Sequence, residues 1–251
     1  RLGNWRWLAM ALCTTVIILS LLIPVSVLVY WVMRGISSGE QIMIPWDHLG
    51  NTLYVSGFAA MATVIASIPI AMISVRYPSR IAILLERLSY IGFALPGIVV
   101  ALAMVFFGIR YATPIYQTVP LLIFAYIVLF LPAALGNIRT SLVQITPVIE
   151  QAARTLGKSP VHVFITITLP LLKTGILAGA VMVLMLTMKE LPATLILSPI
   201  GFKTLATSIW WATEDAFFAK AAAPALLLIL ASSVPMGLIV WLGRLGREEV
   251  L

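Results

Sequence analysis

Apolar residues occur along the chain in six long stretches, and most of the charged and turn-forming residues lie between them. A bilayer core about 30 Å thick is crossed by roughly 20 helical residues, and each stretch reaches that length. Backbone groups in lipid must hydrogen-bond within the protein, and no alternating strand pattern is visible, so we predict helices. The predicted spans are Trp7–Met33, Asn51–Val75, Tyr90–Ile109, Val119–Ile138, Gly175–Ser198 and Ala221–Gly243. The fold class predicted is an all-α integral membrane protein with six transmembrane helices.

Prolines and a glycine pair mark particular points within these spans. Proline removes a backbone donor and kinks a helix, and neighbouring helices in a membrane bundle tolerate such kinks. Gly175 and Gly179 form a small-xxx-small pair, which predicts close helix packing at the start of the fifth span. The prolines expected to kink the spans are Pro24, Pro69, Pro96, Pro132, Pro192 and Pro235.

Composition and charge agree with this topology. Of the 251 residues, 61% are hydrophobic and 10% are charged, which excludes a water-soluble globule. Eleven of the sixteen Lys and Arg residues lie at the two termini and in the second and fourth connections. Positive residues collect on the cytoplasmic side, so both termini of this multi-pass protein are predicted to be cytoplasmic. The net charge of +7 is then a topology signal and does not indicate nucleic-acid binding. The single cysteine, Cys13, excludes disulfides within the chain.

The fourth connection, at about residues 139–174, is long and predicts two short cytoplasmic helices. Thr146-Pro147 and Ser159-Pro160 are helix-start signals, and Gly157 suits a helix end that needs a left-handed residue. Helical spacing predicts one apolar stripe on the first helix. This pattern is compatible with a helix on the membrane surface and with one that inserts into a groove of another protein. The stripe consists of Val148, Ile149, Ala152, Ala153 and Leu156.

A resemblance to a known family favours the second alternative. The EAA loop of ABC importer permeases has a fixed spacing, and the residues that match it here are Gln151, Ala152, Ala153, Gly157, Ile167, Leu169 and Pro170. In that family the loop docks into a cytoplasmic ATPase, so the resemblance implies two ABC ATPase subunits as partners. ATP and Mg²⁺ would be bound by those subunits, and no cofactor by this chain. Gln151 occupies the usual glutamate position and Glu150 precedes it, so either Glu150 takes that role or a neutral contact suffices.

The resemblance extends over the rest of the chain and is similar in detail to the ferric-iron branch of these permeases. The residues that carry it are Asn51–Leu53, Ala94–Gly97, Lys189–Leu195, Gly201-Phe202 and Thr204–Thr207. Such permeases often fuse two six-span halves, and this chain, which begins with Arg1, resembles the second half. The resemblance implies a type I importer core at residues 51–251, preceded at 1–50 by one transmembrane helix and an outer loop.

Within the predicted spans, one acidic residue is present, Glu190, with Lys189 beside it. Ionisable side chains in a membrane cost about 2.5 to 3.5 kcal/mol each and usually face water or the bundle interior. Glu190 is therefore a candidate for the solute passage or its gate, with Lys189 and with Pro192, where the helix can unwind. The structural alternative is a polar contact to another permease half. Adjacent helical residues do not face each other, so Lys189 and Glu190 are not expected to pair.

The last outer segment, Ser198–Lys220, combines tryptophans with charged residues. An interfacial helix with its tryptophans at headgroup depth is one interpretation. The resemblance implies the other, in which the segment docks an extracytoplasmic binding protein, and the candidate contact residues are Trp210, Glu214 and Asp215.

The function predicted is the permease subunit, or half, of an ATP-driven ABC importer in the bacterial cytoplasmic (inner) membrane. Its partners would be the ATPase subunits, a second permease half, the binding protein and the lipid bilayer, and ferric iron is the solute implied by resemblance. Polyamine, phosphonate or sulfate are alternatives with the same machinery. An ion-coupled secondary transporter would use several midplane charges and an internal repeat, whereas the predicted spans contain the single acidic residue Glu190 and no repeat is visible. A membrane enzyme would need a catalytic cluster, and the sequence shows none. No metal site is predicted, because His48 and His162 lie in loops and Glu190 stands alone.

Overall fold

The structure, a computed structural model, describes residues 3, 5–40 and 43–248, with side-chain burial as far as residue 238. In these ranges the ordered elements are helices and no strand occurs, which confirms the all-α class. The elements are α1 (Trp5–Ile17), η1 (Ile18–Leu22), α2 (Ile23–Ser37), α3 (Trp46–Arg76), α4 (Arg80–Ser89), α5 (Ile91–Ala94), α6 (Gly97–Tyr111), η2 (Thr113–Ile115), α7 (Val119–Gln144), α8 (Pro147–Thr155), α9 (Pro160–Val163), η3 (Phe164–Thr168), α10 (Leu169–Leu171), α11 (Lys173–Met188), α12 (Pro192–Leu197), α13 (Leu205–Glu214) and α14 (Phe218–Glu248).

Four continuous stretches are long and apolar enough to cross a membrane: Trp5–Ser37, α3, α7 and the part of α14 up to Leu238. Two helix pairs meet the same criteria together but are bent. Arg80–Ala94 meets Gly97–Tyr111 at 108°, and Pro160–Leu171 meets Lys173–Met188 at 66°. The described chain therefore holds up to six spans if each bent pair counts as one.

The third and fifth predicted spans are not single helices, and this corrects the sequence-based boundaries. Leu95 is extended (φ −93°, ψ 129°), and α6 begins only after Pro96. The fifth span ends at Met188, and Pro192 starts the separate helix α12. At the first break, Pro96 disfavours a helical conformation of Leu95, which is extended. At the second, Leu191 keeps helical angles (φ −113°, ψ −55°), and the contribution of Pro192 is its missing N–H, which cannot donate to the Met188 carbonyl four residues earlier. Pro69, Pro132 and Pro235, in contrast, lie inside continuous helices.

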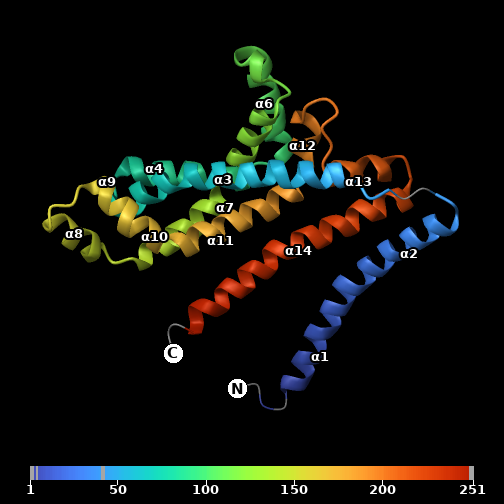
Figure 1. Ribbon diagram of the computed structural model, residues 1–251, viewed down its shortest axis with the longest axis horizontal. Helices are drawn as coiled ribbons and strands as arrows, with labels where there is room; N and C mark the ends of the chain where they lie inside the picture. The colour runs from blue at the N-terminus through green and yellow to red at the C-terminus, as the bar shows by residue number, and fades with distance from the viewer. Residues whose placement is uncertain (1–2, 4, 41–42, 249–251) are drawn as a thin grey trace.

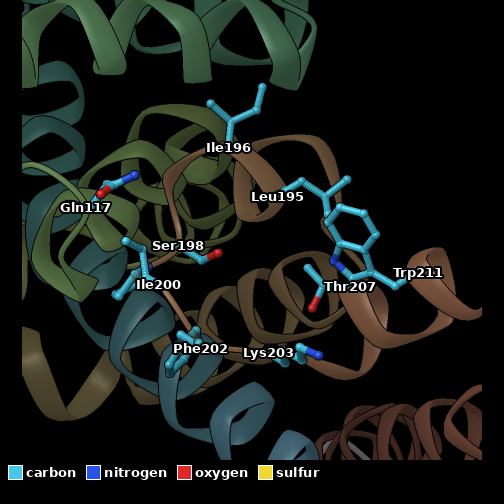
Figure 2. Close-up of a pocket in the computed structure, with 11 residues that line it drawn as sticks. Gln117, Leu195, Ile196, Ser198, Ile200, Phe202, Lys203, Thr207 and Trp211 are labelled. Carbon is cyan, nitrogen blue, oxygen red and sulfur yellow. The ribbon is translucent and has the colours of Figure 1, made fainter.

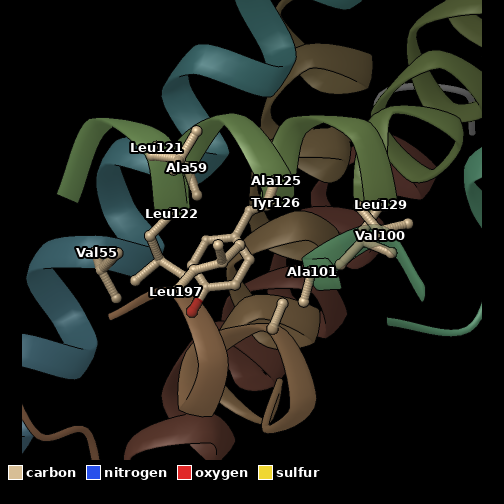
Figure 3. Packing of buried hydrophobic residues seen from close by; sticks show 11 residues of the cluster. Val55, Ala59, Val100, Ala101, Leu121, Leu122, Ala125, Tyr126, Leu129 and Leu197 are labelled. Carbon is tan, nitrogen blue, oxygen red and sulfur yellow. The ribbon is translucent and has the colours of Figure 1, made fainter. Parts of the chain in front are cut away.

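Three helices, α3, α7 and α11, lie side by side and form the centre of the molecule (Figure 1). α8 and α9 lie at one end of this layer and α13 at the other, while α6 and α12 project from it. One buried cluster packs α7 against α3, α6 and α12 around Tyr126, Leu122 and Leu197 (Figure 3). A second cluster continues between α3, α7 and α11 around Leu135, Ile138 and Val183.

The N-terminal helices stand apart from this layer. α1 and η1 have no buried residue, and α2 buries only Gly35. The rings of Trp31 on α2 and Phe218 on α14 lie 5.3 Å apart, so α2 contacts α14 near its C-terminal end.

The glycine pair of α11 packs closely against α7, as the sequence predicts. A Cβ on Gly179 would lie 3.2 Å from Cα and 3.3 Å from the backbone oxygen of Ala134. A Cβ on Gly175 would collide with the Ser141 side chain and lie 3.1 Å from the Asn137 backbone oxygen. Since backbone atoms cannot move away cheaply, only glycine permits this helix spacing.

Gly179→Val is expected to destabilise the folded protein by about 1–3 kcal/mol, because the added methyl groups force α11 away from α7. Thermal unfolding of the purified protein in detergent measures this. Gly57→Val on α3 is the control, since a Cβ there meets nothing within 4 Å. Equal losses at the two positions would contradict the close-packing explanation.

Candidate functional site

The long connection forms the two short helices that the sequence predicts. Pro147 begins α8 after an extended Thr146, and Gly157 ends it with φ +80°. Ser159 caps α9, where its hydroxyl accepts a hydrogen bond from the His162 N–H at 3.3 Å. The proline signals therefore mark the starts of both helices and Gly157 the end of the first, whereas α9 continues into η3.

One side of α8 is exposed and largely apolar. The exposed fractions are 67% for Val148, 46% for Ile149 and 81% for Leu156, and Ala152 beside them is also exposed. We call these four residues the outer face of α8. Ala153, the fifth residue of the predicted stripe, is instead buried against the rest of the protein. Large apolar side chains that are this exposed indicate a surface for a partner or for lipid.

The structure separates Glu150 from Gln151. Gln151 is exposed, whereas Glu150 points inward and pairs with Arg76, the last residue of α3. Arg76 donates to Glu150 Oε1 from Nη2 at 3.0 Å and from Nε at 3.2 Å, and to the Ile145 backbone oxygen at 2.9 Å. Thr168 donates its hydroxyl to the same Oε1 at 3.2 Å. Glu150 is thus an internal contact, and Gln151 is the one of the two that an external partner can reach.

The remaining residues of the EAA-like pattern lie where the chain re-enters the helical layer. Ile167 in η3 and Leu169 in α10 are half-buried, and Pro170 is exposed. They lie just before the 66° bend between Pro160–Leu171 and α11. They are therefore part of the segment that leads into this bend and do not belong to the outer face of α8. On α8 itself, Arg154 donates to the Tyr77 hydroxyl at 3.5 Å, and this hydrogen bond raises the pKa of Arg154.

The three gate candidates lie at the break between α11 and α12. Lys189 is exposed, and in the described part of the chain no ion pair joins it to Glu190. The Glu190 carboxylate accepts hydrogen bonds from the N–H groups of Ala193 at 3.1 Å and Thr194 at 3.2 Å. The Thr194 hydroxyl in turn hydrogen-bonds to the Tyr126 hydroxyl on α7, with 2.6 Å between the two oxygens. Glu190 therefore satisfies the first N–H groups of α12 and ties the break to α7.

Glu190 also borders a hollow of about 320 Å³ between α6, α7 and α11. Gly97 at the start of α6 faces the carboxylate, and a Cβ there would lie 2.7 Å from Glu190 Oε1. The hollow is otherwise mostly apolar, with Leu129, Phe130 and Met182 in its wall. A single half-buried carboxylate in such a hollow can attract a cation but cannot chelate one.

The outer segment is fastened to the first turns of α3. Leu205 donates its N–H to the Thr52 hydroxyl at 2.9 Å, and Asn51 donates to the Lys203 backbone oxygen at 3.0 Å. The hydroxyl oxygen of Ser208 on α13 lies 2.6 Å from Nδ1 of His48, within hydrogen-bond distance. The segment therefore holds a defined position at this end of the layer.

The docking candidates lie on the exposed side of this segment. Trp210 is 43% exposed, and Glu214 and Asp215 are exposed at the end of α13. Beside them is a pocket of about 360 Å³, to which Lys203 and Trp211 contribute side chains (Figure 2). Trp211 was not among the sequence-based candidates, and the pocket that it lines brings the turn at Pro199–Phe202 together with α12, α13 and the distant Gln117.

Sequence reasoning also missed Arg76 and Thr168. An arginine at the end of a span is an ordinary topology signal, and nothing local identifies a partner 74 residues away. Across the residues that the structure describes, no group of three or more His, Cys, Asp or Glu residues could hold a metal ion.

Comparison with known proteins gives the following relatives. The Fe(3+)-transport system permease protein FbpB 2 of Haemophilus influenzae is 39% identical over 228 residues, which are 90% of this chain and 45% of that protein. The chain thus spans about half the length of this relative. The molybdenum transport system permease protein ModB of Escherichia coli is 28% identical over 223 residues, which are 81% of this chain and 96% of ModB.

A solved structure and a family profile agree with these relatives. The fold is similar to a chain of a bacterial alginate ABC transporter solved with an alginate pentasaccharide-bound periplasmic protein, with a TM-score of 0.68 and 16% identity. That similarity covers 98% of this chain and 95% of the other. The profile of the binding-protein-dependent transport system inner membrane component matches residues 63–245. Since this match covers most of the chain, the protein belongs to the family of binding-protein-dependent transport system inner membrane components.

Proposed function

We propose that this chain is one permease half of an ATP-driven importer for ferric iron. Two cytoplasmic ATPase subunits, which bind ATP and Mg²⁺, drive it, and an extracytoplasmic binding protein delivers the ion. A second permease half, fused or separate, completes the passage. Family membership supports the importer class, and the resemblance to the Fe(3+) permease of Haemophilus influenzae supports the choice of ion.

The observation that carries the proposal is the outer face of α8. Four exposed residues form an apolar surface on a helix that ends with a defined turn at Gly157. This surface suits insertion into a groove of another protein. Gln151 borders it and supplies a neutral hydrogen-bonding contact, so the ATPase contact does not use the usual glutamate.

The orientation follows from the same assignment. With α8 in the cytoplasm, α13 at the opposite end of the layer faces outward (Figure 1). Trp210, Glu214 and Asp215 then face the binding protein, and both termini lie on the cytoplasmic side, as the distribution of positive residues predicts. ATP binding shifts the assembled halves between inward-open and outward-open states.

Glu190 borders the passage for the ion in this proposal. The regular helix is interrupted between α11, which ends at Met188, and the short helix α12, and the hollow beside this break contains a carboxylate. Breaks in transporter helices are found where the backbone lines a cavity. Carboxylates along a path favour cations, and one of them gives a weak contact that an ion can leave. Selection of the ion is then the task of the binding protein.

An oxyanion is the second candidate solute, because ModB is also a relative. The charge at the hollow distinguishes the two. An anion path is favoured by Arg, Lys or helix N-termini, whereas in this hollow the charged residue is Glu190 and it occupies the start of α12 itself. The charge therefore supports a cation.

Co-purification tests the proposal directly. An affinity-tagged chain with its second half, extracted from the native membrane, is expected to retain ATPase subunits and to bind a periplasmic protein that carries iron. Mass spectrometry identifies the proteins, and elemental analysis identifies the ion. Absence of ATPase subunits would contradict the importer assignment, and a binding protein loaded with molybdate or phosphonate would contradict the iron assignment alone.

A further inference from the structure

The attachment of α8 to the rest of the protein is narrow. Of its nine residues, two are buried, Glu150 and Ala153. Ala153 offers only a methyl group, so Glu150 provides the buried polar attachment. Among the described residues, the other side-chain hydrogen bond from α8 to a neighbouring segment is the exposed, 3.5 Å bond from Arg154 to Tyr77. A force applied to α8 by a bound partner therefore reaches the other helices chiefly through the two buried side chains and the two ends of the helix.

The Glu150 carboxylate connects α8 to each helix of the central layer. Arg76, its ion-pair partner, is the last residue of α3. The same guanidinium binds the backbone oxygen of Ile145, which ends α7. Thr168, which donates to Glu150 Oε1, lies in the turn that leads through α10 into α11. One charged pair thus joins α8 to the cytoplasmic ends of α3, α7 and α11.

The environment makes this connection stiff. The side chains of Arg76 and Glu150 are 8% and 10% exposed, so water and salt screen the pair weakly. The planar guanidinium makes three hydrogen bonds in fixed directions, which a lysine could not reproduce. The second ion pair, Glu86–Arg139, joins α4 to α7. Its side chains are 22% and 43% exposed, so water and salt screen this pair more strongly than Arg76–Glu150.

We propose that Arg76 and Glu150 are positioning residues that form the internal joint through which movement of α8 reaches α3, α7 and α11. The inference rests on the proposed function, in which α8 docks on the ATPase. It assigns Glu150 to transmission and leaves the contact with the ATPase to Gln151 and the outer face of α8.

The test uses the complete transporter in proteoliposomes, with both permease halves, the ATPase subunits and the iron-loaded binding protein. Glu150→Ala and Arg76→Ala are expected to keep ATPase subunits at the wild-type level, while iron transported per ATP hydrolysed falls about tenfold. Because the two residues act as one unit, the double variant is expected to fall no further. Glu86→Ala and Arg139→Ala are control variants of the same residue types in an ion pair that is less buried and joins α4 to α7 rather than to α8, and they should transport normally.

Two results would overturn the inference. The first is an unchanged transport-to-hydrolysis ratio in the single variants, and the second is loss of the ATPase subunits, which would make Glu150 a docking residue. If the alanine variants do not insert into the membrane, Glu150→Gln replaces them as the test. Glutamine keeps the size of the side chain and one acceptor oxygen but loses the charge, so iron transported per ATP hydrolysed should fall less than in Glu150→Ala but still below the wild-type value. Failure of the proposed function differs from both, since the wild-type chain itself would then bind no ATPase.

Discussion

Leu156→Asp is expected to weaken binding of the ATPase subunits by about 30-fold or more. Leu156 is 81% exposed on the outer face of α8, so it contributes little to folding of the free protein. In the complex it would lie inside an apolar groove, where loss of a central side chain costs about 2 kcal/mol or more. An unpaired carboxylate in that place adds a desolvation cost. Co-purification of ATPase subunits and ATP-dependent uptake measure the effect.

Leu156→Met is the matched control, because it changes shape at nearly constant volume and polarity and should keep the ATPase bound. Thermal unfolding of the two variants without ATPase should agree within about 0.5 kcal/mol, as expected at an exposed position. Normal retention of ATPase subunits by Leu156→Asp would mean that the outer face of α8 rests on lipid instead. In that case the docking assignment of α8 is wrong.

Ala152→Arg extends the same test, because Ala152 is exposed and a long charged side chain would block the approach of a groove. Ala153 is unsuitable, although the sequence places it on the same stripe. It is 8% exposed, so an arginine there would disrupt the packing of α8 and confuse misfolding with loss of docking.

Local signals in the sequence predicted much of the fold. Long apolar stretches in a chain with few charges identify membrane helices, because lipid leaves the backbone few alternatives. Pro147 and Ser159 predicted the starts of the two short helices correctly, and Gly157 the end of the first, since each acts through its own backbone or nearest neighbours. Gly175 and Gly179 likewise predicted a close helix contact, although not that α7 would provide it.

Features that depend on distant residues could not be predicted. Hydropathy counts apolar residues and is insensitive to the 108° bend at Leu95-Pro96 and to the 66° bend between Leu171 and Lys173. It also does not show that α11 ends at Met188, so the predicted third and fifth spans have the wrong boundaries.

Glu150 and Gln151 lie about 100° apart around the helix, and the sequence did not show which of them faces the protein and which faces a partner. The ion pair with Arg76 places Glu150 on the inner side, and Arg76 lies 74 residues away in the chain.

Glu190→Gln is expected to lower iron uptake about tenfold and to leave the stability of the folded protein nearly unchanged. The amide keeps one oxygen that can accept from the N–H groups of Ala193 and Thr194, so the start of α12 stays capped. The negative charge beside the hollow is lost, and a passing cation loses its favourable contact. Uptake of radioactive iron per folded transporter, with thermal unfolding in parallel, measures the two effects separately.

Gly97→Ala separates the position of the carboxylate from its charge. The new Cβ would lie 2.7 Å from Glu190 Oε1, so the carboxylate must leave its present position while the side chain remains a glutamate. Uptake should fall as in Glu190→Gln. Gly136→Ala is the control, because its nearest neighbour would be the Tyr90 hydroxyl at 3.8 Å. Normal uptake per folded transporter in both Glu190→Gln and Gly97→Ala would leave Glu190 a structural cap of α12, and the passage would then lie elsewhere.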